Sequence, residues 1–306
     1  MCEPCRHFGF KGDLRNGVRP SLPPPPSHIT QPARFEEVID PGGLTNVGVR
    51  LHAEGRFRIG TMVAGNSGRP AGACGYPDGT IRSLHAEHST QEEDVVSNWM
   101  HSTCFNSGAE VAADGRHAYA DTIYASTICG QWGMLEPEGD STQTVQKVDY
   151  TRAKQGSYYA DAWVVDGTSL SAKATAPNGS RFFDHTQQYP TALVFVAGPN
   201  CGQLPKRPSS TMRRTFNGYM VEDYGLFREG VKAALYAGLL ALAHTGCDVA
   251  LLAHVSAGIY AGPWKDHLWR DFEAIVNELL SEECGTPSGP VPLGRFFDKV
   301  CLTKLK

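Results

Sequence analysis

A short glycine-bearing segment near the carboxyl end of the sequence has residue types suited to binding a negatively charged group. Residues 256–263 are Ser-Ala-Gly-Ile-Tyr-Ala-Gly-Pro, and they follow an apolar run, residues 249–255, that has the length and composition of a buried parallel strand. A helical pattern over residues 264–280 begins directly afterwards. In this arrangement the backbone N–H groups of the loop can converge on an anion, and the helix dipole adds to the attraction. The sequence therefore predicts a phosphate-binding loop, although an ordinary strand-to-helix connection can have the same composition.

Three consecutive acids form a second group with chemical potential. Glu92, Glu93 and Asp94 follow Gln91 at the start of an amphipathic pattern that predicts a helix over residues 91–105. Carboxylates in the first turn of a helix are stabilised by its dipole, so their position alone has a structural explanation. Carboxyl groups also drive glycosidic cleavage, in which one protonates the leaving atom or activates water and another stabilises the sugar. The residues alone leave both explanations open.

The elements that would position these residues indicate an α/β architecture. Apart from the run before the loop, strand-like patterns cover residues 47–52, 56–64, 158–165 and 192–197, and a long helix is predicted over residues 222–244. A helix followed by a strand, the loop and a further helix favours a mixed, largely parallel sheet with crossover helices. In such sheets ligands bind beyond the carboxyl ends of the strands. The loop at residues 198–202 also follows a strand, and we expect it to border the same cleft.

Three segments together resemble the macrodomain family, the ADP-ribose-binding fold. Residues 256–263 are similar to the family's diphosphate-binding loop, which commonly has the pattern S-x-G-I-Y-G-x-P, with Ala261 in place of a second glycine. The strand-like run at 56–64 ends in a glycine-rich turn that contains Asn66, Pro70 and Gly72, as in macrodomains, where the asparagine bonds the distal ribose. The resemblance implies a macrodomain-like three-layer α/β/α fold.

The Gln-Glu-Glu sequence at residues 91–93 resembles the signature of one branch of that family, the poly(ADP-ribose) glycohydrolases. In those enzymes the adjacent glutamates bind the ribose and drive glycosidic cleavage. This chain differs in its glycine-rich loop and in a longer insert, residues 76–89, before the motif. The difference bears on which substrate is cleaved.

The resemblance implies an ADP-ribosyl hydrolase that removes ADP-ribose from modified proteins by carboxylate-assisted cleavage. It makes Glu93 the general acid/base and Glu92 the partner that orients the ribose. Asp78, in Tyr-Pro-Asp-Gly, is by default a turn residue; on the acceptor side it would suit a guanidinium leaving group, which makes arginine-linked mono-ADP-ribose a candidate substrate. The implied ADP-ribose-binding residues are Asn66, Gly72, Gln91, Ser256, Ala257, Gly258, Ile259 and Tyr260.

Two other functions stay open. A macrodomain that binds ADP-ribose without cleaving it would use the same loop but would have no need of two carboxylates in the cleft. An adaptor would act through the proline-rich segment at residues 21–27. We expect residues 1–40 to form a disordered proline-rich tail and residues 41–306 to form a single macrodomain-like catalytic domain.

The composition of the chain limits which binding partners and cellular compartment we expect. With 28 Lys and Arg against 32 acids, the net charge is −4, and no long basic block is present, so we expect no direct nucleic-acid binding. No apolar run is long enough to cross a bilayer, and the first ten residues lack the apolar core of a signal peptide. The nine cysteines are scattered, which favours reduced thiols, and Cys2 and Cys5 have no second pair at zinc spacing. We therefore expect an intracellular, cytoplasmic monomer that needs no metal or other cofactor and acts on an ADP-ribosylated protein.

Overall fold

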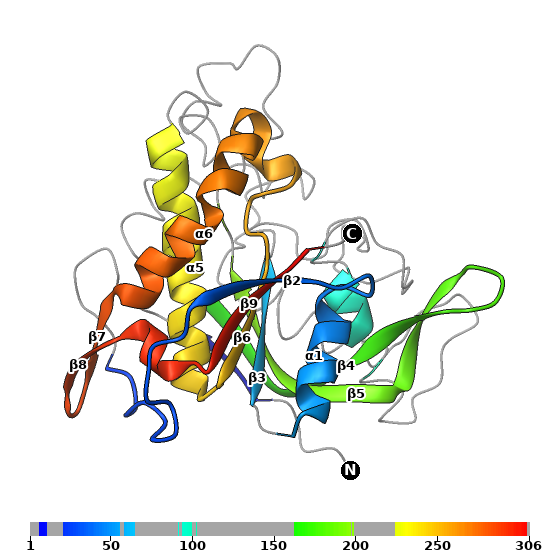
Figure 1. Ribbon diagram of the computed structural model, residues 1–306, viewed down its shortest axis with the longest axis horizontal. Helices are drawn as coiled ribbons and strands as arrows, with labels where there is room; N and C mark the ends of the chain where they lie inside the picture. Colours follow the sequence, from blue (N-terminus) through cyan, green and yellow to red (C-terminus); the bar gives the residue numbers. More distant parts are fainter. Residues whose placement is uncertain are drawn as a thin grey trace, which may run out of the picture.

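A mixed sheet of seven strands organises the molecule (Figure 1). The computed structural model describes residues 6–10, 21–55, 58–64, 91, 94–99, 102, 162–196, 198 and 224–304. In spatial order the strands are β1 (Arg6–Phe10), β4 (Ala162–Thr175), β5 (Arg181–Val196), β3 (Ile59–Ala64), β6 (Val249–Leu252), β9 (Lys299–Lys304) and β2 (Phe35–Ile39). The last five of these run parallel to one another, whereas β4 is antiparallel to both of its neighbours.

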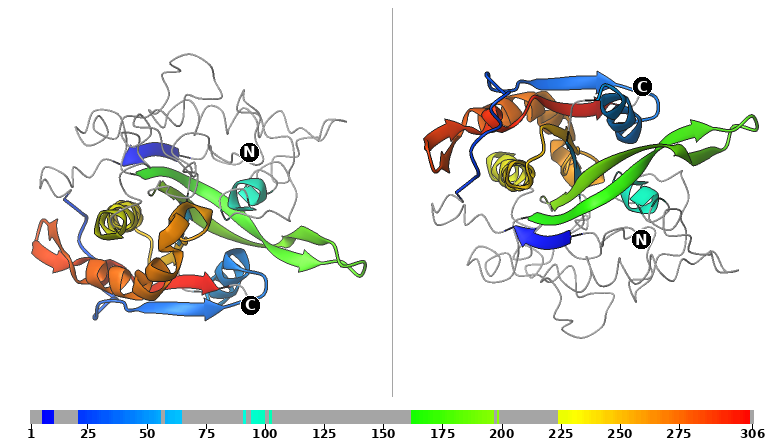
Figure 2. Two further views of the ribbon diagram at one scale, coloured as in Figure 1. Left: turned by 90° about the horizontal axis from the view of Figure 1, so that it is seen from above. Right: turned by 90° about the horizontal axis from the view of Figure 1, so that it is seen from below.

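Helices cover both faces of this sheet. Figure 2 shows α5 (Tyr224–Thr245) and α6 (Lys265–Ser281) on one side, and α1 (Leu44–Ala53) on the other. The helical residues Gln91, 94–99 and Ser102, which we call the Gln91 helix, lie on the same side as α1. The predicted three-layer α/β/α fold with a mixed, largely parallel sheet is therefore confirmed. No helix in the described part of the chain is both long enough and apolar enough to span a membrane.

The sequence of the central strand β3 is almost wholly apolar because both faces of the strand are covered. Gly60 and Met62 face α5, where Gly60 lies against Leu242 and Met62 lies against Gly238. Thr61 points to the opposite face and its hydroxyl hydrogen-bonds the hydroxyls of Tyr189 and Thr191, at 3.1 and 2.9 Å. A strand covered by helices on both faces buries every side chain, so the apolar run replaces the alternation of a half-exposed strand.

Strands β4 and β5 form a long hairpin that projects beyond the other strands (Figure 2). Pairing with β1 ends at Asp166, and beyond that residue side-chain amides bond the free backbone edge of β4. Asn98 donates to the Ser171 carbonyl at 2.7 Å and accepts from the Ser171 N–H at 2.8 Å, and Asn46 of α1 makes the same pair of bonds with Lys173. These amides replace a strand partner and hold α1 and the Gln91 helix to the hairpin.

The carboxyl-terminal segment adds elements that the sequence patterns did not predict. After α6, the strands β7 (Glu283–Thr286) and β8 (Gly289–Pro292) form a small hairpin, and the short 3₁₀ helix η5 (Leu293–Phe296) leads into β9. Strand β9 then enters the main sheet between β6 and β2. The sheet is therefore completed by the last described residues of the chain.

The prediction of a disordered tail over residues 1–40 is wrong for residues 6–10 and 21–40. Strand β1 pairs with β4, and β2 pairs with β9. Between them, Leu22 is 1% exposed and donates its backbone N–H to the Gly285 carbonyl at 2.9 Å. The proline-rich segment is therefore packed against the body at one end, and residue 41 does not mark a boundary between a tail and a domain.

The strand predicted at residues 47–52 is also wrong, because these residues belong to α1. Val47, Gly48 and Leu51 are buried and lie on one face of the helix, a spacing that fits 3.6 residues per turn. Gly48 lets the helix approach the ring of Tyr189 so closely that a Cβ would overlap it. The predicted elements that correspond to β3, α5, β6 and α6 have small shifts of their ends, whereas β4 extends to Thr175, well beyond the predicted 158–165, and β5 begins at Arg181, well before the predicted 192–197.

Candidate active site at the carboxyl ends of the parallel strands

Three neighbouring strands end at the same edge of the sheet. Strands β5, β3 and β6 are adjacent and parallel, and Ala64 at the end of β3 is paired with Val196 at the end of β5. Strand β6 ends nearby at Leu252. Ligand sites of open α/β sheets form at this edge, so the loops that leave these three strands define the candidate site.

The loop after β6 is a series of tight turns. The N–H of Val255 donates to the Ala253 carbonyl at 2.9 Å, and the N–H of Ala257 donates to the His254 carbonyl at 3.1 Å. Ser256 has a φ of 57°, and among the described residues it is the one non-glycine residue with a positive φ. Such a conformation is unfavourable for a residue with a Cβ and occurs most often at functional sites.

The 3₁₀ helix η4 (Ile259–Trp264) connects this loop to α6. Gly262 has a φ of 54° inside η4, a value that glycine tolerates, and α6 begins at Lys265. The predicted strand–loop–helix order is confirmed, with a 3₁₀ turn between the loop and the amino end of α6. The diphosphate-binding role of the loop stays a prediction.

His254 attaches the loop to α6. Its imidazole lies 4.4 Å from the ring of Trp269 and 5.9 Å from the ring of Phe272, measured between ring centroids. Both aromatic residues belong to α6, so the contact fixes the start of the loop relative to the helix that follows it. His254 is not among the predicted site residues, because a single histidine at the end of an apolar run has no distinctive spacing.

The loop after β5 contacts the loop after β6. An added Cβ on Gly198 would lie 2.6 Å from Cγ1 of Val255 and closer still to Oγ of Ser256. Gly198, the one described residue of the 198–202 loop, therefore lies beside the loop after β6, and the role of the 198–202 loop at a cleft stays a prediction. Because β3 lies between β5 and β6 in the sheet, the two loops meet across the end of β3.

Gln91 binds the end of β3 directly. Its Oε1 accepts from the N–H of Ala64, and its Nε2 donates to the carbonyl of Met62, both at 3.0 Å. Pairing between β3 and β6 has already ended at Thr61 and Leu251, so β3 extends beyond that ladder when it meets Gln91. The first residue of the Gln-Glu-Glu motif is therefore held at the edge of the sheet from which the loop at residues 253–258 also leaves.

The third acid of the motif region has a structural partner. Asp94 forms an ion pair with Lys173 of β4, and both side chains are largely buried. Burial raises the pKa of Asp94, while the charge and hydrogen bond of Lys173 oppose that rise. This pair joins the Gln91 helix to the β4–β5 hairpin, so Asp94 is directed toward β4.

The predicted site residues divide into those that the structure describes and those that lie outside the described residues. The structure describes Gln91, Ser256, Ala257 and Gly258 together with the backbone of Ile259 and Tyr260, and all lie in the elements that leave the same edge of the sheet. The other predicted residues, Asn66, Gly72, Asp78, Glu92 and Glu93, lie outside the described residues. The roles assigned to both groups stay predictions.

A metal site is not formed by the described residues. Among them, no group of three or more His, Cys, Asp or Glu side chains could hold a metal ion. Cys247, Cys284 and Cys301 are buried thiols outside any disulfide, and burial raises the pKa of Cys301 to about 11.

Neither a protein-family model nor a curated protein matches this sequence. Structural comparison aligns the chain with the poly(ADP-ribose) glycohydrolase of Deinococcus radiodurans in complex with ADP-ribose, at a TM-score of 0.49 and 12% identity, covering 100% of this chain and 89% of that chain. A second alignment, with the poly(ADP-ribose) glycohydrolase of Thermomonospora curvata, has a TM-score of 0.46 and 12% identity and covers 99% of this chain and 80% of that chain. The function proposed below rests on the motifs and contacts of this chain itself.

An aromatic cluster lies where α5 and α6 begin. The ring of Tyr224 lies 5.7 Å from that of Trp264 and 5.3 Å from that of His267. The Tyr224 hydroxyl donates to Asp271 at 2.7 Å, and both its burial and this carboxylate raise the pKa of the phenol. The cluster ties the amino end of α5 to the end of η4 and therefore braces the loop region.

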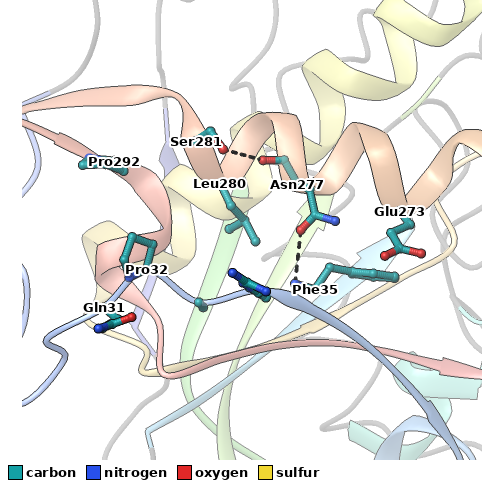
Figure 3. A pocket seen from close by; sticks show the side chains of 10 residues that line it. Gln31, Pro32, Phe35, Glu273, Asn277, Leu280, Ser281 and Pro292 are labelled. Atoms are coloured by element: carbon teal, nitrogen blue, oxygen red, sulfur yellow. Dashed lines mark hydrogen bonds between the residues drawn. The ribbon is translucent and has the colours of Figure 1, made fainter.

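A separate hollow of about 600 Å³ lies at the other end of α6 (Figure 3). It is formed by the segment that leads into β2 and by the carboxyl half of α6; its lining includes Gln31, Pro32, Phe35, Glu273, Asn277, Leu280, Ser281 and Pro292. Across it, the Phe35 N–H donates to Oδ1 of Asn277 at 3.4 Å. Since β2 begins here and runs parallel to β9, the hollow lies at the amino-end edge of the sheet, opposite the candidate site.

Proposed function

We propose that this protein binds ADP-ribose at the carboxyl ends of β3, β5 and β6 and hydrolyses the bond between ADP-ribose and a modified protein. The observation that carries the proposal is the attachment of Gln91 to Met62 and Ala64. Two sequence segments with suitable chemistry, separated by more than half of the chain, thereby start from the same edge of the sheet. One supplies a glycine-bearing turn for a diphosphate, and the other supplies adjacent carboxylates for an anomeric carbon.

We assign binding to three parts of the site. The turn at residues 256–260 holds the diphosphate, and Tyr260 covers the distal sugar. The N–H of Ala257 already donates to His254, so Ala257 contributes through the turn that it closes. Asn66 and Glu92 hydrogen-bond the distal ribose. The positive φ of Ser256 supports this assignment, because strained backbone is retained where it serves binding.

Glu93 acts as the general acid and then as the general base. As the bond between the anomeric carbon and the acceptor atom breaks, the carboxyl group of Glu93 gives its proton to the leaving acceptor. The sugar then has oxocarbenium character, which the carboxylate of Glu92 stabilises. Water attacks the anomeric carbon and gives a proton to Glu93, so free ADP-ribose leaves and the enzyme returns to its starting protonation state.

We propose arginine-linked mono-ADP-ribose as the substrate. The reason is Asp78, since a further acid on the acceptor side would suit a guanidinium leaving group. Proteins carrying arginine-, glutamate- or serine-linked ADP-ribose, offered at equal concentration, test the linkage. Faster release from the arginine-linked protein is expected, and equal rates on all three would overturn this assignment while leaving hydrolysis itself intact.

Replacing Glu93, the proposed acid/base, should impair hydrolysis while binding is retained. We expect Glu93→Gln to reduce release of ADP-ribose by about 100-fold or more, because the amide cannot donate or accept the proton, while calorimetry still detects ADP-ribose binding. Glu273→Gln is the matched control, since Glu273 lies in the hollow at the opposite edge of the sheet. Unchanged release in Glu93→Gln contradicts the assigned role.

The alternative, a reader that binds ADP-ribose without cleaving it, gives a different pattern. In that case calorimetry detects binding by the unmodified chain, but no modified protein releases ADP-ribose. The adjacent acids Glu92 and Glu93 favour the hydrolase, because a reader gains nothing from two carboxylates beside the sugar.

A further inference from the structure

Gly198 lies where the loop after β5 meets the loop after β6. It follows Val196, the last residue of β5, by two positions, and its neighbours across the gap are Val255 and Ser256. Because β3 separates β5 from β6, this contact spans the end of the strand that Gln91 also binds. The position of the phosphate loop over the site is therefore set partly from the side of β5.

The space at Gly198 admits no side chain without movement of the loop. A Cβ would lie 2.6 Å from Cγ1 of Val255 and closer still to Oγ of Ser256, whereas Cβ atoms essentially never approach another heavy atom to within 3.0 Å. Val255 is 0% exposed and Ser256 is 6% exposed, so neither side chain can turn into solvent. The Cβ of an alanine at position 198 therefore overlaps two packed side chains, so either residues 255–256 or residue 198 itself must shift.

The backbone that would be displaced has little tolerance for change. Ser256 holds a left-handed conformation, which a non-glycine residue keeps only when its surroundings enforce it. The surroundings are the turn bonds of Val255 and Ala257 and the packing of His254 against α6. A Cβ at residue 198 would contact Ser256, the residue of this loop whose backbone conformation tolerates displacement least.

We infer that Gly198 is a positioning residue for the loop at residues 255–258, and that its lack of a side chain sets the affinity for the diphosphate. The identity of the ligand as a diphosphate rests on the proposed function, whereas the effect of Gly198 on the loop conformation does not. The sequence motif alone would not identify this residue, because Gly198 lies far from the loop along the chain.

Calorimetry with ADP-ribose on the full chain tests the inference. We expect Gly198→Ala to bind about tenfold more weakly or worse, since a small displacement of converging N–H groups costs affinity steeply. Gly285→Ala in β7 is the matched neutral control, because nothing lies within 4 Å of its Cβ. Gly60→Ala is the matched crowded control: its Cβ meets Cys247 and Leu242 on the face that α5 covers, so it should lower the melting temperature and keep the affinity.

A second substitution tests the cause. Ser256→Gly in the Gly198→Ala background removes the closest clashing atom and suits the positive φ, so it should restore part of the affinity; the contact with Val255 remains. The inference is overturned if Gly198→Ala binds within twofold of the unmodified chain, or loses no more affinity than Gly60→Ala.

Hydrogen exchange separates a failure of this inference from a failure of the proposed function. Without ligand, Gly198→Ala should speed amide exchange across residues 253–262 relative to Gly285→Ala. If the unmodified chain does not bind ADP-ribose, the proposed function fails and the exchange experiment still decides the role of Gly198. Unchanged exchange in this loop overturns the inference.

Discussion

Gln91 joins two distant parts of the chain through one amide group. Gln91 is a predicted ligand-binding residue, and in the structure its side-chain oxygen and nitrogen both bond the backbone of β3. The motif therefore contains a residue that fixes the helix start, directly before the two glutamates proposed for chemistry. No pattern in the sequence could reveal these partners, because they are backbone groups of a strand far upstream.

The amide of Gln91 should contribute to stability as well as to activity. Gln91→Ala leaves the Met62 carbonyl and the Ala64 N–H without this partner, so we expect a loss of about 1–3 kcal/mol in the free energy of unfolding. Urea unfolding measures it, and release of ADP-ribose should fall in parallel.

The matched control for that substitution is Gln187→Ala, whose single exposed bond to Asp184 predicts a change within about 0.5 kcal/mol. Gln91→Glu should destabilise the protein at least as much as Gln91→Ala, because its carboxylate still accepts from Ala64 but places a second acceptor against the Met62 carbonyl. A Gln91→Ala protein as stable as the original would show that the bonds to β3 are dispensable.

At the scale of elements, the Gln91 helix is held to the β4–β5 hairpin by a charge pair. The carboxylate of Asp94 and the ammonium of Lys173 are both largely buried, and Asn98 of the same helix bonds β4 two residues away, at Ser171. Burial raises the pKa of Asp94 and Lys173 limits that rise. Loss of the lysine would leave a buried carboxylate without its compensating charge.

Lys173→Met should therefore destabilise the protein in a pH-dependent way. A folded-state pKa above the unfolded value makes this group favour folding at low pH, and that contribution is lost as the pH rises through the folded pKa. Without Lys173 the folded pKa rises further. We expect a loss of about 3–5 kcal/mol near neutral pH and a smaller loss in acid, where Asp94 is protonated.

Urea unfolding at two pH values, for this variant and for Lys232→Met, measures the effect. Lys232 pairs with Glu278 at the surface between α5 and α6, so its loss should cost about 1 kcal/mol or less. Adding Asp94→Asn to Lys173→Met should remove the pH dependence. An equal loss at both pH values would show that the Asp94 carboxylate is not the group responsible.

The sequence predicted best the elements whose hydrophobic pattern is unambiguous. These are the long apolar face of α5 and the unbroken apolar run of β6. Residues 47–52 alternate apolar and polar types, which fits a strand, whereas the helix buries Val47, Gly48 and Leu51 on one face, with Gly48 against Tyr189. At the site, the order of loop and helix was predictable, whereas the contacts of Gly198 and His254 depend on how separate loops meet.

At the scale of the whole molecule, both ends of the chain belong to the sheet. Strand β2 is only five residues long, and the adjacent Glu36 and Glu37 interrupt the apolar alternation that would distinguish a strand from an extended tail. Their place is decided by partners at the other end of the sequence, since β2 pairs with β9. This is why the predicted tail was wrong although its composition suggested disorder.

Deleting residues 1–40 should therefore destroy the fold rather than remove an appendage. The deletion takes away β1, β2 and the buried side chain of Leu22, and it leaves β9 as an uncovered edge. We expect the shortened chain to lose cooperative thermal unfolding. Phe35→Ala, which keeps β2 but removes a ring 6.2 Å from that of Phe272, should cost about 3–5 kcal/mol and still unfold cooperatively.

The near-ultraviolet circular dichroism of both proteins checks this expectation, and a native spectrum for the shortened chain would contradict it. An adaptor role for the proline-rich segment is better tested by replacing the exposed Pro23 and Pro24 with alanine, because these substitutions leave the strands in place.

The position of β9 between β6 and β2 has a consequence for biosynthesis. As the chain leaves the ribosome, β2 is made early and its neighbour β9 is made only after all the residues between them, so β2 stays unpaired while those residues are synthesised. Pairing of such high contact order folds slowly and exposes an unpaired strand to other nascent chains in the meantime. Expression of this protein should therefore respond to chaperone supply and to growth temperature.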